Sequence, residues 1–219
     1  MVSTEFQRAR RPEQKETRRE SLLEAAASLL AEGGFDAVGL NAIARRAGLS
    51  KSNVYRYFES REQILLALLA EDETRWVATL EEQLAPLGGS DDVAAVGKVV
   101  AQTLAADRRL CLLTTVLATV LEQNISRDTV IAFKDTVLAL GRRIGNALHA
   151  ALPSLSLEAA QEAQHLIHAL LAGLWPICHP APTVREALDA ERFCVFRHDF
   201  DRDLERGVTL LLRALVAEA

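Results

Sequence analysis

Cysteine, methionine and aromatic residues are scarce in this chain, and the few cysteines stand far apart. The 219 residues include three cysteines, one methionine and 5% aromatic residues. Cys111, Cys178 and Cys194 form no CxxC pair, and no Cys/His pair stands at zinc-binding spacing. An odd number of isolated cysteines argues against both a disulfide framework and a zinc module. We therefore expect three free thiols in a reducing cytoplasm.

Long apolar runs and enzyme motifs are also missing. No apolar stretch reaches the roughly 18 uncharged residues expected of a membrane-spanning helix, and the polar, Arg-rich N-terminus lacks the apolar core of a signal peptide. Strand-like alternation of β-branched residues is rare, which predicts an all-α fold. The sequence shows no nucleophile–base pair, no Gly-rich phosphate loop and no metal cluster. We expect a cytoplasmic protein with no catalytic residues, no cofactor, no metal and no membrane partner.

The charge of the chain is distributed unevenly. Its formal net charge is −5, but residues 1–60 hold ten Lys and Arg against eight Asp and Glu, a net of +2. Residues 61–219 hold fifteen against twenty-two, a net of −7. The positive charge is therefore concentrated near the N-terminus, where its placement matters more for binding an anionic partner than the total does.

Apolar residues recur at helical spacing along most of the chain. Gly33–Gly34 stop the first helix, and Ser60 with Gln63 three residues later forms a capping-box pattern. Residues 1–15 read as a mobile basic arm of the kind that enters a minor groove. The expected helices are 17–32, 40–47, 51–58, 61–84, 91–106, 108–124, 127–151, 156–177, 184–190 and 200–216.

The stretch LNAIARRAGLSKSNVYRYFES, residues 40–60, is the most informative part of the sequence. A short apolar-periodic helix ends at Gly48, a turn follows, and a second short helix carries basic, hydroxyl and amide side chains. Two helices joined by a glycine-containing turn are typical of a helix-turn-helix, whose second helix enters the major groove of DNA. The alternative is an ordinary helical hairpin with a solvated polar face.

These residues and their neighbours resemble the tetracycline-repressor (TetR) family of transcriptional regulators. The resemblance covers about the first 70 residues and rests on LAEGGFDAV (30–38), IARRAGLSK (43–51) and VYRYFESREQIL (54–65). It implies a homodimer with an N-terminal DNA-binding domain and a larger C-terminal domain for ligand binding and dimerisation. Gly39 departs from the usual Thr or Ser cap, and Ser52-Asn53 replaces the commoner Gly-Thr or Gly-Ser.

Several side chains are candidates for the DNA face. Val54 and Phe58, four residues apart, are the expected core pair, which leaves the polar residues outside. Asn53 can pair with adenine, the tyrosine hydroxyls suit phosphate, and Lys51 and Arg56 can reach guanine or phosphate. By resemblance Arg61 grips phosphate, whereas Arg45 and Arg46 are expected to be solvated. The predicted DNA-binding residues are Lys51, Ser52, Asn53, Tyr55, Arg56, Tyr57 and Arg61.

The segment 95–180 is apolar with sparse polar groups, as small-ligand pockets between helices are. Each of its residues can equally be ordinary core, and the absence of an internal Lys/Arg cluster favours an apolar or aromatic effector. Glu162, His165 and His168 share a helix face, but no matching Glu-x-x-His motif accompanies them as a metal site needs. The predicted ligand-binding residues are Leu104, Cys111, Thr115, Thr119, Phe133, His168, Leu171 and Trp175.

Together these features predict an all-α protein with two parts. Residues 1–60 form a three-helix DNA-binding domain with a basic arm, and residues 61–219 form a helical effector-binding and dimerisation domain. We expect a repressor that leaves a palindromic operator on double-stranded DNA when a small-molecule effector binds. A transcriptional activator and a ligand-independent DNA-binding protein remain alternatives, and an enzyme in a helical bundle is disfavoured. The sequence identifies neither the effector nor the operator.

Overall fold

A computed structural model of the protein describes residues 12–218, and within this range the chain is helical with no strand. This confirms the all-α prediction. Short 3₁₀ segments lie at Phe35–Ala37 (η1), Ala85–Leu87 (η2) and Glu191–Phe196 (η4), and a π-helical turn, η3, spans Leu117–Leu121. The α-helices are α1 Pro12–Gly33, α2 Leu40–Arg46, α3 Lys51–Val54, α4 Arg61–Leu84, α5 Val93–Ala105, α6 Arg108–Val116, α7 Arg127–Ala151, α8 Leu157–Cys178, α9 Pro182–Leu188 and α10 Phe200–Glu218.

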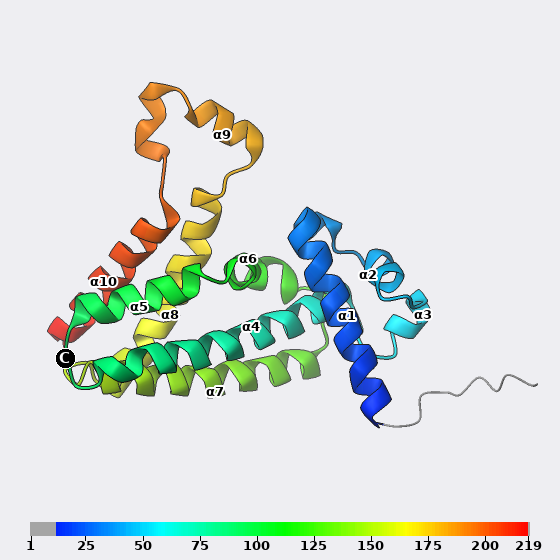
Figure 1. Cartoon of the computed structure of the whole chain (residues 1–219), viewed down its shortest axis with the longest axis horizontal. Coiled ribbons are helices and arrows are strands. Elements are labelled where there is room, and N and C mark those ends of the chain that lie inside the picture. Colours follow the sequence, from blue (N-terminus) through cyan, green and yellow to red (C-terminus); the bar gives the residue numbers. More distant parts are fainter. Residues whose placement is uncertain (1–11, 219) are drawn as a thin grey trace, which may run out of the picture.

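The N-terminal helices form a small bundle at one end of the molecule (Figure 1). Helix α1 packs against α2 and α4, and α2 packs against α3. Leu22, Ile43 and Val54 are fully buried between these helices, with Phe58 beside them. The expected core pair Val54 and Phe58 is therefore confirmed. Their burial turns the opposite side of α3 outward.

Helices α5, α6, α7 and α10 pack around α4 and α8. Helix α4 lies along α7, α7 and α6 both pack on α8, and α10 packs against α5 and α8. Figure 1 shows α4 and α7 side by side along the long axis, with α9 standing apart from the other helices. One apolar core runs through both bundles because α4 contributes side chains to each. None of the described helices combines the length and apolarity needed to cross a bilayer.

The start of α4 confirms the predicted cap. The hydroxyl of Ser60 accepts a hydrogen bond from the backbone N of Gln63 at 3.1 Å. In return, Gln63 Oε1 accepts from the backbone N of Glu59 at 2.7 Å, one residue before the position that a standard capping box uses. Two backbone donors at this helix end are thereby satisfied.

Three expected helix boundaries are wrong. Helix α1 begins at Pro12, not at residue 17, because proline suits the first helical turn, where its missing N–H costs no hydrogen bond. Lys15 consequently belongs to α1, while residues 1–11 of the proposed basic arm lie outside the described part. The α-helical span of the second motif helix ends at Val54, and tighter turns follow it. Three aromatic residues, Tyr55, Tyr57 and Phe58, follow Val54, and aromatic side chains disfavour a longer helix because they lose rotamer freedom in it. The expected helix 108–124 ends in the π-helical turn η3.

A buried carboxylate joins α4 to α6. Asp72 is fully buried on α4 and accepts from Arg109 Nε at 2.6 Å and from Arg109 Nη2 at 2.5 Å. Arg75 also donates to Asp72 and reaches Asp107 Oδ2 at 3.0 Å. A buried charge is tolerated only when it is paired and hydrogen-bonded, and these two guanidinium groups meet that requirement.

We expect the substitution Asp72→Asn to lower the free energy of unfolding by about 2 kcal/mol, because it removes charge-assisted hydrogen bonds and places an amide against two guanidinium groups. Urea denaturation measures this loss. Asp135→Asn is the matched control, since Asp135 is exposed on α7. An equal loss in both variants would show that the α4–α6 pairing adds nothing to stability.

Candidate DNA interface and sensing core

The turn between α2 and α3 depends on a glycine. Gly48 has φ of +67°, a conformation in which any other side chain is strained. Its neighbour Leu49 donates a backbone hydrogen bond to Ala44 O at 2.8 Å, which closes the turn. At the start of α2, Gly39 provides no side-chain cap, as the sequence implied. Backbone hydrogen bonds therefore close the turn between α2 and α3, and neither helix begins with a side-chain cap.

The side of α3 away from the core is polar. Lys51, Ser52, Tyr55 and Arg56 are exposed, and Tyr57 is half-buried at the edge. Lys51 Nζ lies 6.0 Å from the centre of the Tyr55 ring, and the hydroxyl groups of Ser50 and Ser52 are 3.0 Å apart. The half-buried Asn53 sits between the core and the polar face. Of the predicted DNA-binding residues of this helix and the turn after it, four are therefore accessible and two are partly accessible.

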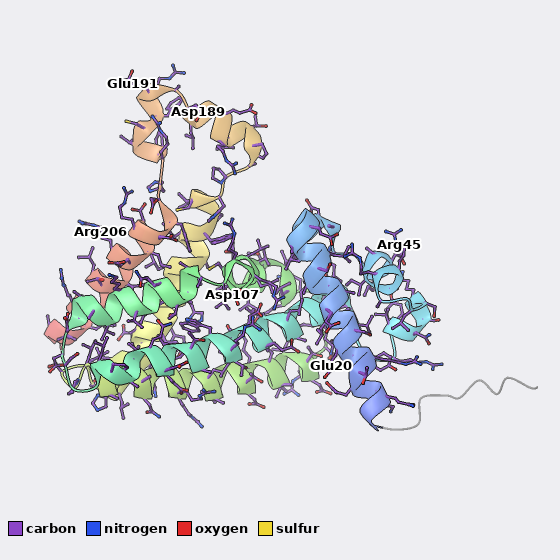
Figure 2. All side chains as sticks on the ribbon, viewed as in Figure 1. Glu20, Arg45, Asp107, Asp189, Glu191 and Arg206 are labelled. Atoms are coloured by element: carbon purple, nitrogen blue, oxygen red, sulfur yellow. The ribbon has the colours of Figure 1, made fainter. Side chains whose placement is uncertain are left out.

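The arginines near α3 differ in their surroundings. Arg46 donates to both carboxylate oxygens of Glu32, at 2.8 and 2.7 Å, and so ties α2 to α1. This hydrogen bonding lowers the pKa of Glu32 to about 2. Arg45 is exposed and points away from the bundle in Figure 2. Arg61 donates to Val38 O at 3.4 Å and lies 4.8 Å above the Phe35 ring, so its guanidinium is already held in place.

A cluster of four residues, here called the junction, connects the N-terminal bundle to α7. Glu59 Oε1 accepts from the backbone N of Ser126 at 2.7 Å and from the hydroxyl of Thr129 at 2.9 Å. Gln63 Nε2 donates to the same Thr129 oxygen at 2.9 Å. The backbone N–H of Ser126 lowers the pKa of Glu59, which favours the carboxylate. The N-terminus of α7 is thus held by the segment between α3 and α4.

In residues 12–218, the hollow beside Phe133 and the hollow beside His168 each contain only one of the predicted ligand-binding residues. Leu104, Cys111 and Leu171 are buried in the core, where Cys111 Sγ donates to Leu104 O at 3.3 Å. Burial raises the pKa of Cys111 to about 12, so this thiol remains protonated. Thr115 donates its hydroxyl proton to Cys111 O at 2.9 Å, and Thr119 is exposed on η3.

The aromatic members of that set have different surroundings. Phe133 lines an open groove of about 370 Å³ between α1, α4 and α7. Trp175 stacks on His179 with ring centres 3.8 Å apart and meets the edge of Phe200 at 5.0 Å. His168 lines a small hollow of about 10 Å³ between α4, α7 and α8, together with Glu73 and Gln164. The predicted residues therefore occupy several separate environments.

The sequence reasoning missed Glu73 and Gln164. Both are buried, and Glu73 Oε1 lies 3.9 Å from His168 Nε2. Burial raises the pKa of Glu73 to about 7, and desolvation lowers the pKa of His168. Gly141 on α7 allows this packing, because a Cβ there would lie 2.5 Å from Gln164 Oε1. A signal was present: Glu73 interrupts the apolar stripe of α4 between Leu69 and Trp76.

Comparison with known families divides the chain into two matches. Residues 22–68 match the model described as "Bacterial regulatory proteins, tetR family". Residues 70–219 match "Tetracyclin repressor-like, C-terminal domain". The two matches follow one another along the chain and cover the helix-turn-helix and the helices behind it.

Among curated proteins, the transcriptional repressor KstR of Rhodococcus jostii is 40% identical over 62 residues, which is 28% of this chain and 29% of KstR. The fatty acid metabolism regulator protein of Bacillus subtilis is 30% identical over 71 residues, 32% of this chain and 37% of that protein. The chain thus matches about a third of the length of these relatives.

Solved structures resemble the whole fold. The fatty acid degradation regulator FadR from Bacillus halodurans superposes with a TM-score of 0.58 at 16% identity, over 95% of this chain and 98% of that one. FadR from Bacillus subtilis was solved in complex with stearoyl-CoA. It superposes with a TM-score of 0.53 at 18% identity, over 88% of this chain and 96% of that one. At these identities the likeness concerns the fold.

Glu73 leads to a prediction about pH. Its pKa of about 7 in the folded protein lies above the ordinary value of 4.5, so the folded state binds more protons between these two pH values. Stability is therefore expected to fall as pH rises from 4.5 to 7 and to change no further through this group above pH 7. Glu73→Gln removes that dependence and raises the free energy of unfolding at pH 8 by up to about 3 kcal/mol.

Urea denaturation of both proteins at pH 4.5 and pH 8 measures the effect. Glu82→Gln is the control, because Glu82 is exposed on the same helix. If Glu73→Gln left the stability at pH 8 unchanged or lower, the cost assigned to burying this carboxylate would be refuted.

Proposed function

Because the chain belongs to the tetR family of bacterial regulatory proteins, we propose that it is a dimeric repressor released from a palindromic operator by a small apolar or aromatic ligand. The family matches and the named relatives are transcriptional regulators, not enzymes. In this proposal residues 1–60 bind DNA, while residues 61–219 bind the effector and form the dimer. The outer face of α3 is the observation that carries it.

That face has the chemistry of a recognition surface. Val54 and Phe58 anchor the helix from within. Outside, Lys51 and Arg56 supply cations for phosphate or guanine, and Asn53 can bond adenine through both its amide atoms. Tyr55 projects its hydroxyl from an exposed ring, in a position suited to the DNA backbone.

A palindromic site requires two such helices about 34–36 Å apart, or a multiple of this spacing, on a twofold dimer. Helices α8 and α10 supply the proposed seam, since each packs on the core by one side and exposes a leucine, Leu166 and Leu210, on another. Pairing both helices with their copies covers these apolar residues.

A response to ligand requires contacts that connect the helices of the C-terminal domain to α3. Helices α4 and α7 provide one, because both contact the hollow beside Glu73 and both meet at the junction near α3. A ligand that separates α4 from α7 favours a different spacing of the recognition helices. It acts only through its difference in affinity for the two arrangements.

The interior suggests the first compounds to test as effectors. A ligand that separates α4 from α7 would meet the apolar side chains of Trp76, Leu140 and Ile144, with Glu73, Gln164 and His168 as the polar groups that orient one of its ends. Long-chain acyl compounds should be tested as effectors beside aromatic ones, because a regulator of similar fold was solved with stearoyl-CoA.

Selection of bound sequences from a random DNA pool at fixed salt tests the operator model. A palindromic motif is expected. Asn53→Ala should relax the preference at one position by about tenfold, the loss expected when a bidentate base contact disappears. Tyr55→Phe should weaken every sequence alike by about fivefold, since a lost phosphate contact carries no base information.

Identical shifts of the sequence profile in the two variants would contradict these roles. Absence of any enriched motif, with binding that only fades as salt rises, would overturn the operator model itself.

The junction generates a second prediction. In Glu59→Ala the backbone N of Ser126 and the hydroxyl of Thr129 both lose their carboxylate partner. We expect faster hydrogen exchange in residues 126–133 and also in residues 51–63, because the contacts between the two segments limit local opening of both. Hydrogen-exchange mass spectrometry at constant pH resolves the two segments.

Glu82→Ala on the exposed side of α4 is the control and should change neither segment. Faster exchange confined to residues 126–133 would mean that Glu59 only caps α7 and does not couple it to the DNA-binding bundle.

A further inference from the structure

The carboxylate of Glu73 is buried on α4 without a hydrogen-bond donor. Glu73 is 6% exposed, and within residues 12–218 its side chain forms no hydrogen bond. Its Oε1 lies 3.9 Å from His168 Nε2, which is too far for a hydrogen bond. The adjacent Asp72, by contrast, accepts hydrogen bonds from two arginines. Glu73 therefore bears the cost of burial and lacks the donors that usually offset it.

His168 presents a second acceptor to this carboxylate. Its Nδ1 lies 2.9 Å from Gln164 O, and because a carbonyl oxygen only accepts, Nδ1 carries the ring proton. Desolvation lowers the pKa of His168, so the ring is neutral and its Nε2 has a free lone pair. Two acceptors thus face each other across 3.9 Å, and one donor group placed between them can reach both.

Gln164 and Trp76 complete the polar side of the hollow beside Glu73. The side-chain amide of Gln164 is buried and forms no hydrogen bond within the described chain, so its oxygen is a third acceptor. The indole N–H of Trp76 is already donated to Thr103 at 3.1 Å, and its ring borders the hollow. Indole rings attract cations, and none of the residues that line the hollow is Lys or Arg.

These groups match the chemistry of a primary ammonium. An ammonium carries three N–H donors and a positive charge, as the side chain of lysine does. The hollow of about 10 Å³ has the size of one water-sized group, which an ammonium head also is. Val137, Leu140 and Ile144 on α7 border it and offer apolar contacts to an organic body. An anionic ligand would instead face the carboxylate of Glu73.

We propose that this hollow recognises the protonated amine of a ligand whose other end is apolar or aromatic. The inference rests on the proposed function and names the charge of its effector. The ammonium lies between Glu73, His168 and Gln164, and the organic body separates α4 from α7, the movement on which the proposed response depends. The His168 side chain is 25% exposed, so the hollow lies within reach of solvent.

Three compounds of similar size and different charge test the ligand class. Isothermal titration calorimetry of the full-length protein at pH 8, without DNA, compares 2-phenylethylamine, 2-phenylethanol and 3-phenylpropionate. The amine is expected to bind at least about tenfold more tightly than the alcohol, because charge-assisted hydrogen bonds are stronger than neutral ones. The propionate should bind most weakly. Equal affinities of the amine and the alcohol, or tighter binding of the propionate, would overturn the proposal.

Glu73→Gln tests the residue that carries the recognition. It keeps the size of the side chain and removes its charge, and it is the variant expected above to be more stable at pH 8, so unfolding does not obscure the result. The affinity for 2-phenylethylamine should fall about tenfold, while the affinity for 2-phenylethanol should not fall. Glu82→Gln, exposed on the same helix, should leave both affinities unchanged.

The affinity for the amine should rise about tenfold from pH 6 to pH 8. With a pKa of about 7, Glu73 becomes a carboxylate over this interval, whereas an aliphatic amine stays protonated, as lysine does. The other charged or titratable groups that act on the pair are Asp72 on α4, Lys134 on α7 and His165 on α8. Protonated His165 or His168 also repels an ammonium at low pH, and Glu73→Gln leaves both imidazoles in place. An equal pH dependence in this variant would assign the effect to the imidazoles and contradict the role of Glu73.

Operator binding separates this proposal from the function on which it rests. Amine binding that depends on Glu73 but leaves operator affinity unchanged would support the ammonium site and contradict release by this ligand. If the amine binds the Glu73→Gln variant as tightly as the wild type, or gives no binding heat at any pH, the ammonium site is overturned. A palindromic motif from the random DNA pool would still support the repressor in that case.

Discussion

The packing of α4 is the constraint on which the rest of the structure depends. Over 24 residues its buried side chains enter the N-terminal bundle at one end and the core beside α7 at the other. A continuous helix of this kind cannot shift at one end without moving the other, because its backbone hydrogen bonds keep it stiff. The position of the DNA-binding bundle is therefore tied to how tightly α4 packs against α5, α6 and α7.

Two buried carboxylates on α4, those of Asp72 and Glu73, affect the stability of that packing in different ways. Asp72 is well satisfied by two arginines and holds α6, whereas Glu73 is buried beside His168 without comparable pairing. An imperfectly satisfied carboxylate costs stability, and proteins commonly retain such groups where function requires them. Asp72 therefore fixes α4 to α6, whereas the costly carboxylate of Glu73 lies between α4, α7 and α8. The same helices meet again at the junction, which links this region to α3.

Residues 179–199, which connect α8 to α10 and include α9 and η4, differ from the rest of the molecule in their packing. A single subunit exposes Val195 and Phe196 on a segment with little packing of its own, yet an aromatic cluster fixes its base. Rigid support beneath an apolar surface reduces the entropy lost when that surface is covered, which favours association. The exposed apolar side chains of this segment therefore lie on a base that is held in a fixed orientation.

Local patterns in the sequence predicted most of the helices well. The helix 127–151 agrees with α7 at both ends, and Ser60 caps α4 as expected, because caps and helical periodicity depend on residues only a few positions apart. The buried pair Val54 and Phe58 follows from the same spacing. The family resemblance, which rests on the first 70 or so residues, agrees with the matches now found over residues 22–219.

Contacts between distant parts of the chain could not be read in this way. Glu59 with Ser126, Arg46 with Glu32 and Gln164 with Gly141 each join residues on different helices, and no local pattern pairs them. The eight predicted ligand-binding residues were apolar or weakly polar in a helical region, a property that core and pocket share, and the fold distributes them among separate sites. The sequence by itself determined most of the helices and which residues of α3 lie outside the core, because these depend on short-range periodicity, and the resemblance of its first 70 or so residues indicated the family. Only the tertiary structure decided which polar side chains are buried together and that residues 179–199 project from the body of the molecule, because those outcomes depend on how whole helices pack.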